Sequence, residues 1–288
     1  MKYEEKNELY KERTLSERLS AAATFLRQNA GVLYKNTIIP AIPLVMLLAY
    51  FLLKYIEMAQ EFAPALASGE IPDVPFQGML FLPVAMIFSL FLFSMSGAVM
   101  SLYEEGGLST ASNWSNLCSK MYSNAGKLLL ICLAMTLIFV IACLLFGMLV
   151  AIGGTALKSL LIFLFFFLLI AVIPALSLVI FPALFQGAST FASIKKGFSL
   201  GLKNWGTTVA TLIIAGVMAG LVSIVLSLPF DLYTALNSNG NSIVIYLLAV
   251  LWACGGALTT PFIFVFLAFQ YFSIAEKITE KEEEDIYC

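Results

Sequence analysis

Histidine is absent from this 288-residue chain, and charged side chains are scarce. The imidazole group is the usual acid–base catalyst and metal ligand near neutral pH, so its absence excludes most metal centres and catalytic triads. Only 12% of the residues are charged and 60% are hydrophobic, whereas about a quarter of the residues of a soluble domain are charged. With a mean hydropathy of +0.93, the sequence predicts an all-α protein that spans a lipid bilayer.

Cysteine is also sparse, and its spacing carries no known site. The five cysteines are Cys118, Cys132, Cys143, Cys254 and Cys288, with no Cys-x-x-Cys pair among them. This pattern favours neither a zinc site nor a disulfide framework. The net charge of −2 gives no general attraction to nucleic acid. We expect no cofactor and no nucleic-acid partner.

Long apolar segments dominate what is present. Six of them are long enough to cross the roughly 30 Å of bilayer hydrocarbon, at 38–56, 79–102, 128–152, 160–185, 207–228 and 243–272. Fourteen of the sixteen Lys and Arg residues lie outside these spans on one side of the predicted topology, and only Lys54 and Lys158 remain for the other. The positive-inside rule therefore predicts a multi-pass protein of the bacterial inner membrane with both termini in the cytoplasm.

The motif Asn-x-Gly occurs three times, at Asn29, Asn124 and Asn204, and each copy precedes two apolar spans. Apolar or small residues recur along one helical face before each asparagine, and basic residues lie between them. We therefore expect three cytoplasmic amphipathic helices, each closed by Asn-x-Gly and followed by a transmembrane hairpin. The repeat units are 14–103, 109–186 and 189–275 of one membrane domain, with an acidic tail at 276–288. Chance recurrence is the alternative.

Helix-end signals and interface residues can also be assigned. Thr14-Leu15-Ser16-Glu17 is typical of a capping box at the start of the first helix. The residues expected in the interface helices are Trp114, Lys195, Lys196, Lys203 and Trp205, and the two tryptophan rings are expected at the depth of the lipid headgroups.

Proline recurs in the second span of each predicted hairpin, as Pro83, as Pro174 with Pro182, and as Pro261. Each proline frees a backbone carbonyl one turn earlier, which a nearby hydroxyl can satisfy. If these kinks border a cavity, the candidate ligand-lining residues are Ser177, Thr259, Thr260 and Gln270. The interpretation that we favour is a kink that shapes helix packing, because no ionisable group accompanies it.

The fifth span has a face of small residues formed by Gly216, Gly220, Ser223 and Ser227. Such faces allow helices to approach closely. We expect this one to pack against the sixth span of the same chain, and dimerisation is the alternative.

Residues 180–206, IFPALFQGASTFASIKKGFSLGLKNWG, and the ending from Phe269 to Lys277 resemble a known membrane-domain family. This family is the membrane-embedded domain that accompanies some bacterial glycerophosphodiester phosphodiesterases, with its free-standing relatives. The resemblance implies a fold and no activity, since the hydrolase barrel and its histidines are absent. Gln186 stands where the family often has an acid.

We accordingly expect a protein that is not an enzyme and acts as a scaffold, assembly or accessory factor on membrane lipids or on a partner membrane protein. The alternative is a transporter or lipid-handling protein whose cavity is lined by the proline-kinked helices. Catalysis would require a cluster of carboxylates brought together by folding, which only Glu104, Glu105, Asp231 and the acids of the outer loops could supply.

Overall fold

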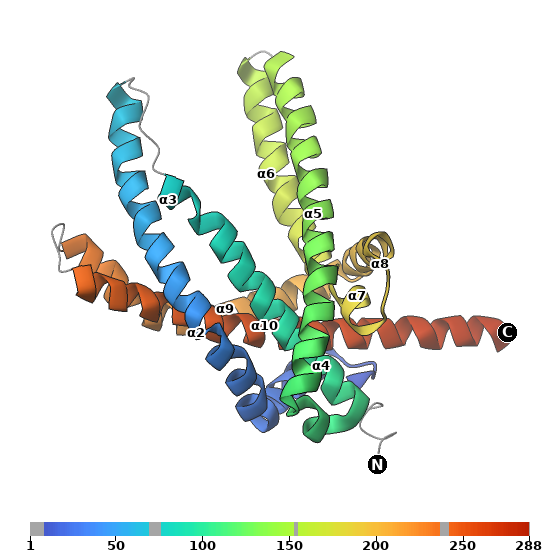
Figure 1. Cartoon of the computed structure of the whole chain (residues 1–288). Coiled ribbons are helices and arrows are strands. Elements are labelled where there is room, and N and C mark those ends of the chain that lie inside the picture. Colours follow the sequence, from blue (N-terminus) through green and yellow to red (C-terminus); the bar gives the residue numbers. More distant parts are fainter. Residues whose placement is uncertain (1–8, 69–75, 153–154, 237–241, 288) are drawn as a thin grey trace.

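The computed structural model describes residues 9–68, 76–152, 155–236 and 242–287, in which every regular element is a helix. The all-α prediction is therefore confirmed. Figure 1 labels the helices by their order along the chain. They are α2 (Leu15–Ser68), α3 (Phe76–Met79), α4 (Phe81–Ala111), α5 (Trp114–Ile152), α6 (Thr155–Ser177), α7 (Phe181–Phe185), α8 (Thr190–Lys203), α9 (Trp205–Leu236) and α10 (Ser242–Tyr287).

The described residues contain six helical stretches that are long and apolar enough to cross a membrane. These stretches overlap all six predicted spans, so each predicted span falls on a helical stretch that is long and apolar enough for a multi-pass membrane protein. They are Leu15–Phe62, Phe76–Gly106, Trp114–Ala151, Lys158–Phe185, Trp205–Leu236 and Ile243–Glu276.

The long helices form three pairs that diverge from a common base: α2 with α4, α5 with α6, and α9 with α10 (Figure 1). The largest hydrophobic core lies at this base, where α2, α4, α5, α7 and α10 meet. Its fully buried side chains include Leu33, Met95, Phe181, Phe264 and Tyr271. The first and third pairs also pack against one another, mainly through α2 and α10. The core is thus concentrated at one end of the bundle.

The predicted capping box at the start of α2 is confirmed. The backbone N–H of Thr14 donates to Glu17 Oε2 at 2.8 Å, and the N–H of Glu17 lies 3.4 Å from Thr14 Oγ1. Two backbone donors that the first turn leaves unpaired are therefore satisfied reciprocally.

The prediction that Asn-x-Gly closes a helix is wrong for two of its three copies. Asn29 lies inside α2 and Asn124 lies inside α5. The Asn29 side chain donates to the Phe25 carbonyl of the same helix at 3.0 Å. Phe25 and Leu33, one turn before and one turn after Asn29, are buried in the same core. Both can be buried only if the helix continues through Asn29, so their packing favours the unbroken helix. Local stop signals are weak against such packing.

The third copy does end a helix, because Asn204 is the C-cap of α8 and α9 begins at Trp205. Residues 15–29 and 114–124, by contrast, form the first turns of the long helices α2 and α5. Of the three expected surface helices, therefore, only α8 is a helix distinct from the membrane-spanning helix that follows it among the described residues. The threefold repeat itself stays a prediction.

A buried serine organises the break between α6 and α7. Ser193 Oγ of α8 donates to the Val179 carbonyl at 2.6 Å and accepts from the Ala183 N–H at 3.0 Å. These two groups would bond to one another in a continuous helix. The hydroxyl thus takes the place of one helical hydrogen bond. Gly187, with φ of 65°, then ends α7 in the left-handed conformation that favours glycine.

Candidate functional site

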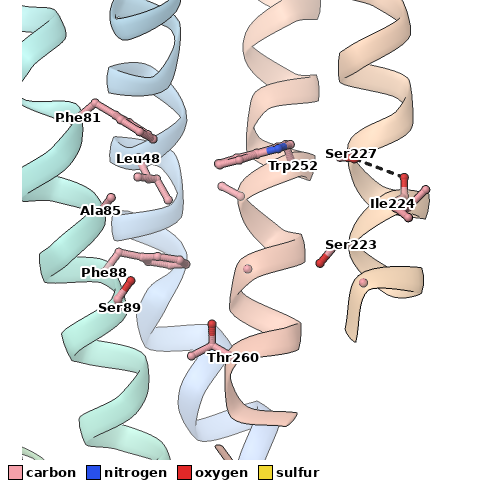
Figure 2. Close-up of a pocket in the computed structure, with 13 residues that line it drawn as sticks. Leu48, Phe81, Ala85, Phe88, Ser89, Ser223, Ile224, Ser227, Trp252 and Thr260 are labelled. Carbon is pink, nitrogen blue, oxygen red and sulfur yellow. Dashed lines mark hydrogen bonds between the residues drawn. The ribbon is translucent and has the colours of Figure 1, made fainter. Parts of the chain in front are cut away.

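A cavity of about 460 Å³ lies between the first and third helix pairs, and α10 forms its floor. In Figure 2, Phe88 and Ser89 of α4 lie on one side of α10, and Ser223 and Ser227 of α9 lie on the other. The floor is made of Ala253, Gly256 and other residues of α10, including Thr260. The lining is mostly apolar with a few hydroxyl groups, and the volume falls within the ~300–1,000 Å³ typical of small-molecule sites.

A second cavity, of about 340 Å³, lies on another side of α4, between α4, α5 and α6. Its lining is apolar apart from two serines, Ser89 and Ser177, and a thiol, Cys132. Ser89 also lines the first cavity. Two apolar cavities of comparable size therefore border α4, each next to a proline-containing segment of α6 or α10.

The four candidate ligand-lining residues are not brought together. Thr260 lines the first cavity and Ser177 the second. Thr259 is buried, and its hydroxyl donates to the Gly255 carbonyl at 2.8 Å. Gln270 is fully buried at the base of the bundle. The structure thus divides these residues between two cavities and the protein interior.

The expected role of the Ser177 and Thr259 hydroxyls near the prolines is wrong. Pro174 frees the Ile170 carbonyl and Pro261 frees the Ala257 carbonyl. The Ser177 hydroxyl instead donates to the Pro174 carbonyl at 2.8 Å, and the Thr259 hydroxyl donates to Gly255. Each hydroxyl has a single hydrogen to donate and binds the carbonyl in its own preceding turn, which a helical Ser or Thr reaches most easily.

Gln270 joins three helices through a buried polar network. Its Oε1 accepts a hydrogen bond from Arg18 Nη1 of α2 and lies 3.1 Å from Thr211 Oγ1 of α9. Its Nε2 donates to Thr207 and Thr208 Oγ1, both at 3.1 Å. Sequence reasoning identified Gln270 as a ligand-lining candidate. Its side-chain oxygen and nitrogen both have partners, so it serves helix association here.

The segment before α2 is fixed to the same end of α10. The Arg13 N–H donates to Ser273 Oγ at 2.9 Å, and the Ser273 hydroxyl lies 3.3 Å from the Arg13 carbonyl. The Tyr10 ring packs 4.7 Å from the ring of Phe272. Burial, together with the nearby Glu104 carboxylate, raises the pKa of the Tyr10 hydroxyl. The start of the described chain is thus part of the base.

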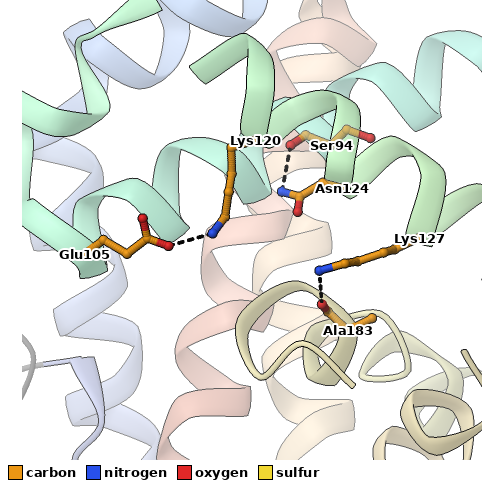
Figure 3. A network of polar contacts seen from close by, with 6 residues as sticks. All are labelled: Ser94, Glu105, Lys120, Asn124, Lys127 and Ala183. Atoms are coloured by element: carbon orange, nitrogen blue, oxygen red, sulfur yellow. Dashed lines mark hydrogen bonds and ion pairs between the residues drawn. The ribbon is translucent and has the colours of Figure 1, made fainter. Parts of the chain in front are cut away.

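Polar contacts tie α5 to its neighbours (Figure 3). Lys120 pairs with Glu105 of α4 at 2.6 Å, and the Asn124 side chain donates to the Ser94 carbonyl of α4 at 3.4 Å. Lys127 Nζ donates to the Ala183 carbonyl in α7 at 3.2 Å. Glu105, considered above for a catalytic cluster, is engaged in this ion pair. In the described residues no three Cys, Asp or Glu side chains gather to hold a metal ion.

The small face of α9 contacts α10 only in part: a Cβ added at Gly255 of α10 would lie 3.8 Å from the Ser223 Cα, whereas the two glycines of this face have no close neighbour. A Cβ atom added at Gly216 or Gly220 would meet nothing within 4 Å, and Gly220 borders the first cavity. The buried residues of α9 are Thr208, Thr211, Ala215, Ala219 and Phe230. The prediction that α9 packs against α10 is confirmed.

Sequence reasoning missed the close glycine contact, which lies on α8. A Cβ at Gly197 would overlap the Val179 Cα and lie 2.6 Å from the Leu178 carbonyl oxygen. A Cβ at Gly201 would lie 2.5 Å from the Ala175 Cα. Gly197 and Gly201 have the same spacing of four as Gly216 and Gly220, so this signal was present in the sequence.

The five interface residues lie at the base end of the molecule. Trp114 and Trp205 are the first residues of α5 and α9, and both are exposed. The Trp205 indole N–H donates to the Ala171 carbonyl of α6 at 2.7 Å. Lys195, Lys196 and Lys203 are exposed on α8 and line a groove of about 470 Å³.

Comparisons of the chain with protein-family models, curated proteins and solved structures found no match. The resemblance to the phosphodiesterase-associated membrane domain therefore stays a prediction.

Proposed function

We propose that this protein is a non-catalytic scaffold, assembly or accessory factor that acts on membrane lipids or on a partner membrane protein. We place it in a bacterial inner membrane with both termini in the cytoplasm, as the distribution of Lys and Arg favours. The lack of histidine and the engagement of Glu105 by Lys120 support a role without catalysis.

The observation that carries this proposal is the isolation of the α5–α6 hairpin. Among the residues whose exposure is described, none in 132–151 of α5 or 158–173 of α6 is buried. The other two pairs have buried side chains far from the base, such as Leu48 in α2 and Ala249 in α10. Phe146 and Phe165 stack at 4.3 Å between the two helices of the isolated hairpin. This hairpin therefore offers apolar side chains on all sides.

A hairpin with this surface is stable only where lipid tails or the helices of another protein cover it. Its exposed side chains are large, and they include Leu144 at 64% and Phe167 at 65% exposure. Lipid tails alone can cover such a surface. Covering by lipid does not explain, however, why this hairpin stands apart while the other two pairs pack against one another. A helix pair that is held at its base and free at its sides suits a docking element.

Site-specific photo-crosslinking tests this role. A photoreactive residue is placed at Leu144 or Phe167 of the hairpin, and at Val225 of α9 as a control of similar exposure. We expect the hairpin positions to yield a defined protein adduct or a selected lipid, and the control to yield bulk lipid. If all three positions capture the same bulk lipids, the hairpin is not a docking element and the proposal fails.

The two cavities beside α4 favour a second candidate, a lipid-handling protein. Their volumes of about 460 and 340 Å³ and their apolar walls with scattered hydroxyls suit a lipid chain. Reconstituted protein would then move labelled phospholipid between the leaflets of a vesicle. Vesicles in which the lipid moves no faster than in protein-free vesicles would rule this candidate out.

A further inference from the structure

The helix α8 is held rigidly against the end of α6. Ser193 inserts its hydroxyl between the Val179 carbonyl and the Ala183 N–H. One turn later, Gly197 brings the backbone of α8 directly onto residues 178–179, just after α6, and two turns later Gly201 brings it onto Ala175 of α6. This buried face fixes the rotation of α8 about its own axis, so its other side chains have defined directions.

One of the remaining faces of α8 is basic and polar. Lys195, Ser199 and Lys203 follow one another at intervals of four, and Lys196 lies beside them. With Gln186 at the end of α7, they line the groove of about 470 Å³. The volume is sufficient for a phosphate group and the atoms attached to it.

No carboxylate accompanies these lysines in the neighbouring sequence. The sequence between Gln186 and Leu228 contains three lysines and no acid. In the described parts of the chain, ion pairs join Lys54 to Glu57 and Lys120 to Glu105, and neither involves α8. Three cationic groups around one groove therefore attract an anion, and ammonium groups bind phosphate oxygens well.

The third face of α8 carries exposed apolar side chains. Such side chains can contact the acyl chains of a lipid but gain nothing from a free phosphate, so they favour a lipid as the ligand. Phe191 is 77% exposed and Leu202 48% exposed; by helical spacing they lie beside Ile194 and Phe198, which are half-buried against Ile131 and its neighbours. Phe191 and Leu202 adjoin the lysine face at Lys195 and Lys203. A helix with these neighbouring faces lies in the bilayer interface, with apolar side chains among the acyl chains and lysines among the headgroups.

We infer that the groove formed by Gln186, Lys195, Lys196, Ser199 and Lys203 binds the phosphate of an anionic phospholipid headgroup. This inference rests on the proposed function in so far as lipids are the ligands, and it adds a headgroup site on α8 to the docking surface of the α5–α6 hairpin. The lysines contact the phosphate, and Phe191 and Leu202 contact the upper part of the acyl chains.

Native mass spectrometry of the full chain in a neutral detergent tests the inference. Phosphatidylglycerol and phosphatidylcholine are titrated separately against the wild type and against the variant Lys195→Gln/Lys196→Gln/Lys203→Gln. The control variant is Arg27→Gln/Lys35→Gln/Lys158→Gln, which removes the same charge elsewhere. At about 1 kcal/mol for each lysine, we expect the α8 variant to bind phosphatidylglycerol about a hundredfold more weakly. The control should bind it as the wild type does.

Two further arms identify the source of the phosphate. Phe191→Ala/Leu202→Ala should weaken phosphatidylglycerol binding several-fold, and an excess of inorganic phosphate should displace little of the lipid. Equal affinity for the two lipids, or equal loss in the α8 and control variants, would overturn the inference. Efficient displacement by inorganic phosphate would overturn the assignment to a lipid. Crosslinking at Leu144 and Phe167 does not depend on α8. It therefore reports a failure of the proposed function, whereas the lipid titrations report a failure of the α8 site.

Discussion

Replacing Gly197 by alanine should destabilise the protein, because no space exists for a methyl group there. The added Cβ would overlap the Val179 Cα and lie 2.6 Å from the Leu178 carbonyl oxygen. Ordinary contacts of a carbon atom are about 3.5–4.0 Å, so α8 must move away from α6 by roughly 1 Å. Both neighbours are backbone atoms and cannot be displaced by a change of rotamer.

The size of the effect follows from the contacts that this movement breaks. Overpacking of this kind costs about 1–3 kcal/mol. A shift of α8 also stretches the two Ser193 hydrogen bonds of 2.6 and 3.0 Å, each with a net value of about 1 kcal/mol. The higher helix propensity of alanine offsets about 1 kcal/mol. We expect a net loss of about 2–4 kcal/mol, and therefore a melting temperature lower by roughly 5–12 °C.

Gly216→Ala and Gly220→Ala provide the matched control. These glycines have the same spacing, but a Cβ at either position meets nothing within 4 Å. We expect unchanged or slightly higher stability, since only the helix propensity changes. The assay is thermal unfolding in detergent, followed by size-exclusion chromatography. If Gly197→Ala melts together with the control variants, the described packing of α8 on α6 is incorrect.

Three further predictions concern the polar network, the topology and the cavities. Gln270→Leu should lower the free energy of unfolding by about 2–3 kcal/mol, because it removes the hydrogen-bond partner of Arg18 Nη1. Gln270→Glu keeps an acceptor for Arg18 and should retain most of the stability. Equal melting temperatures of the two variants would contradict this. Single-cysteine variants that retain Cys118, or Cys288, which lies outside the described residues, should resist a membrane-impermeant thiol reagent in intact cells, and strong labelling of either would refute the predicted orientation. Thr260→Val and Ser177→Ala should reduce the lipid retained on purification at unchanged folded yield if the cavities hold lipid. The matched change Thr259→Val, at a residue that lines neither cavity, should leave lipid retention unaltered, and equal effects of all three would favour a packing role.

The spans could be predicted from the sequence because bilayer thickness imposes a minimum apolar length, which local composition reports directly. The capping box at Thr14 was also predictable, since both of its partners lie within one turn. These features depend on residues that are close together in the chain.

Features that depend on distant neighbours could not be predicted. The helix continues through Asn29 because Phe25 and Leu33 are buried in one core, which the local stop signal does not reveal. Gly197 and Gly216 both belong to glycine pairs four residues apart, yet only the first meets another backbone, because spacing does not say which face has a neighbour. The partners of Gln270 in α2 and α9 lie 252 and 62 residues away.

The central claim is that the protein acts without catalysis on lipids or on a partner membrane protein. Gentle purification from its native membrane, followed by mass spectrometry of co-purifying lipids and proteins, tests it most directly. We predict that a defined lipid class or one membrane protein remains bound at a fixed ratio, and that α5–α6 crosslinks report the same molecule. Protein that carries neither, but shows hydrolytic turnover that is lost on changing Glu104 or Glu105, would contradict the account.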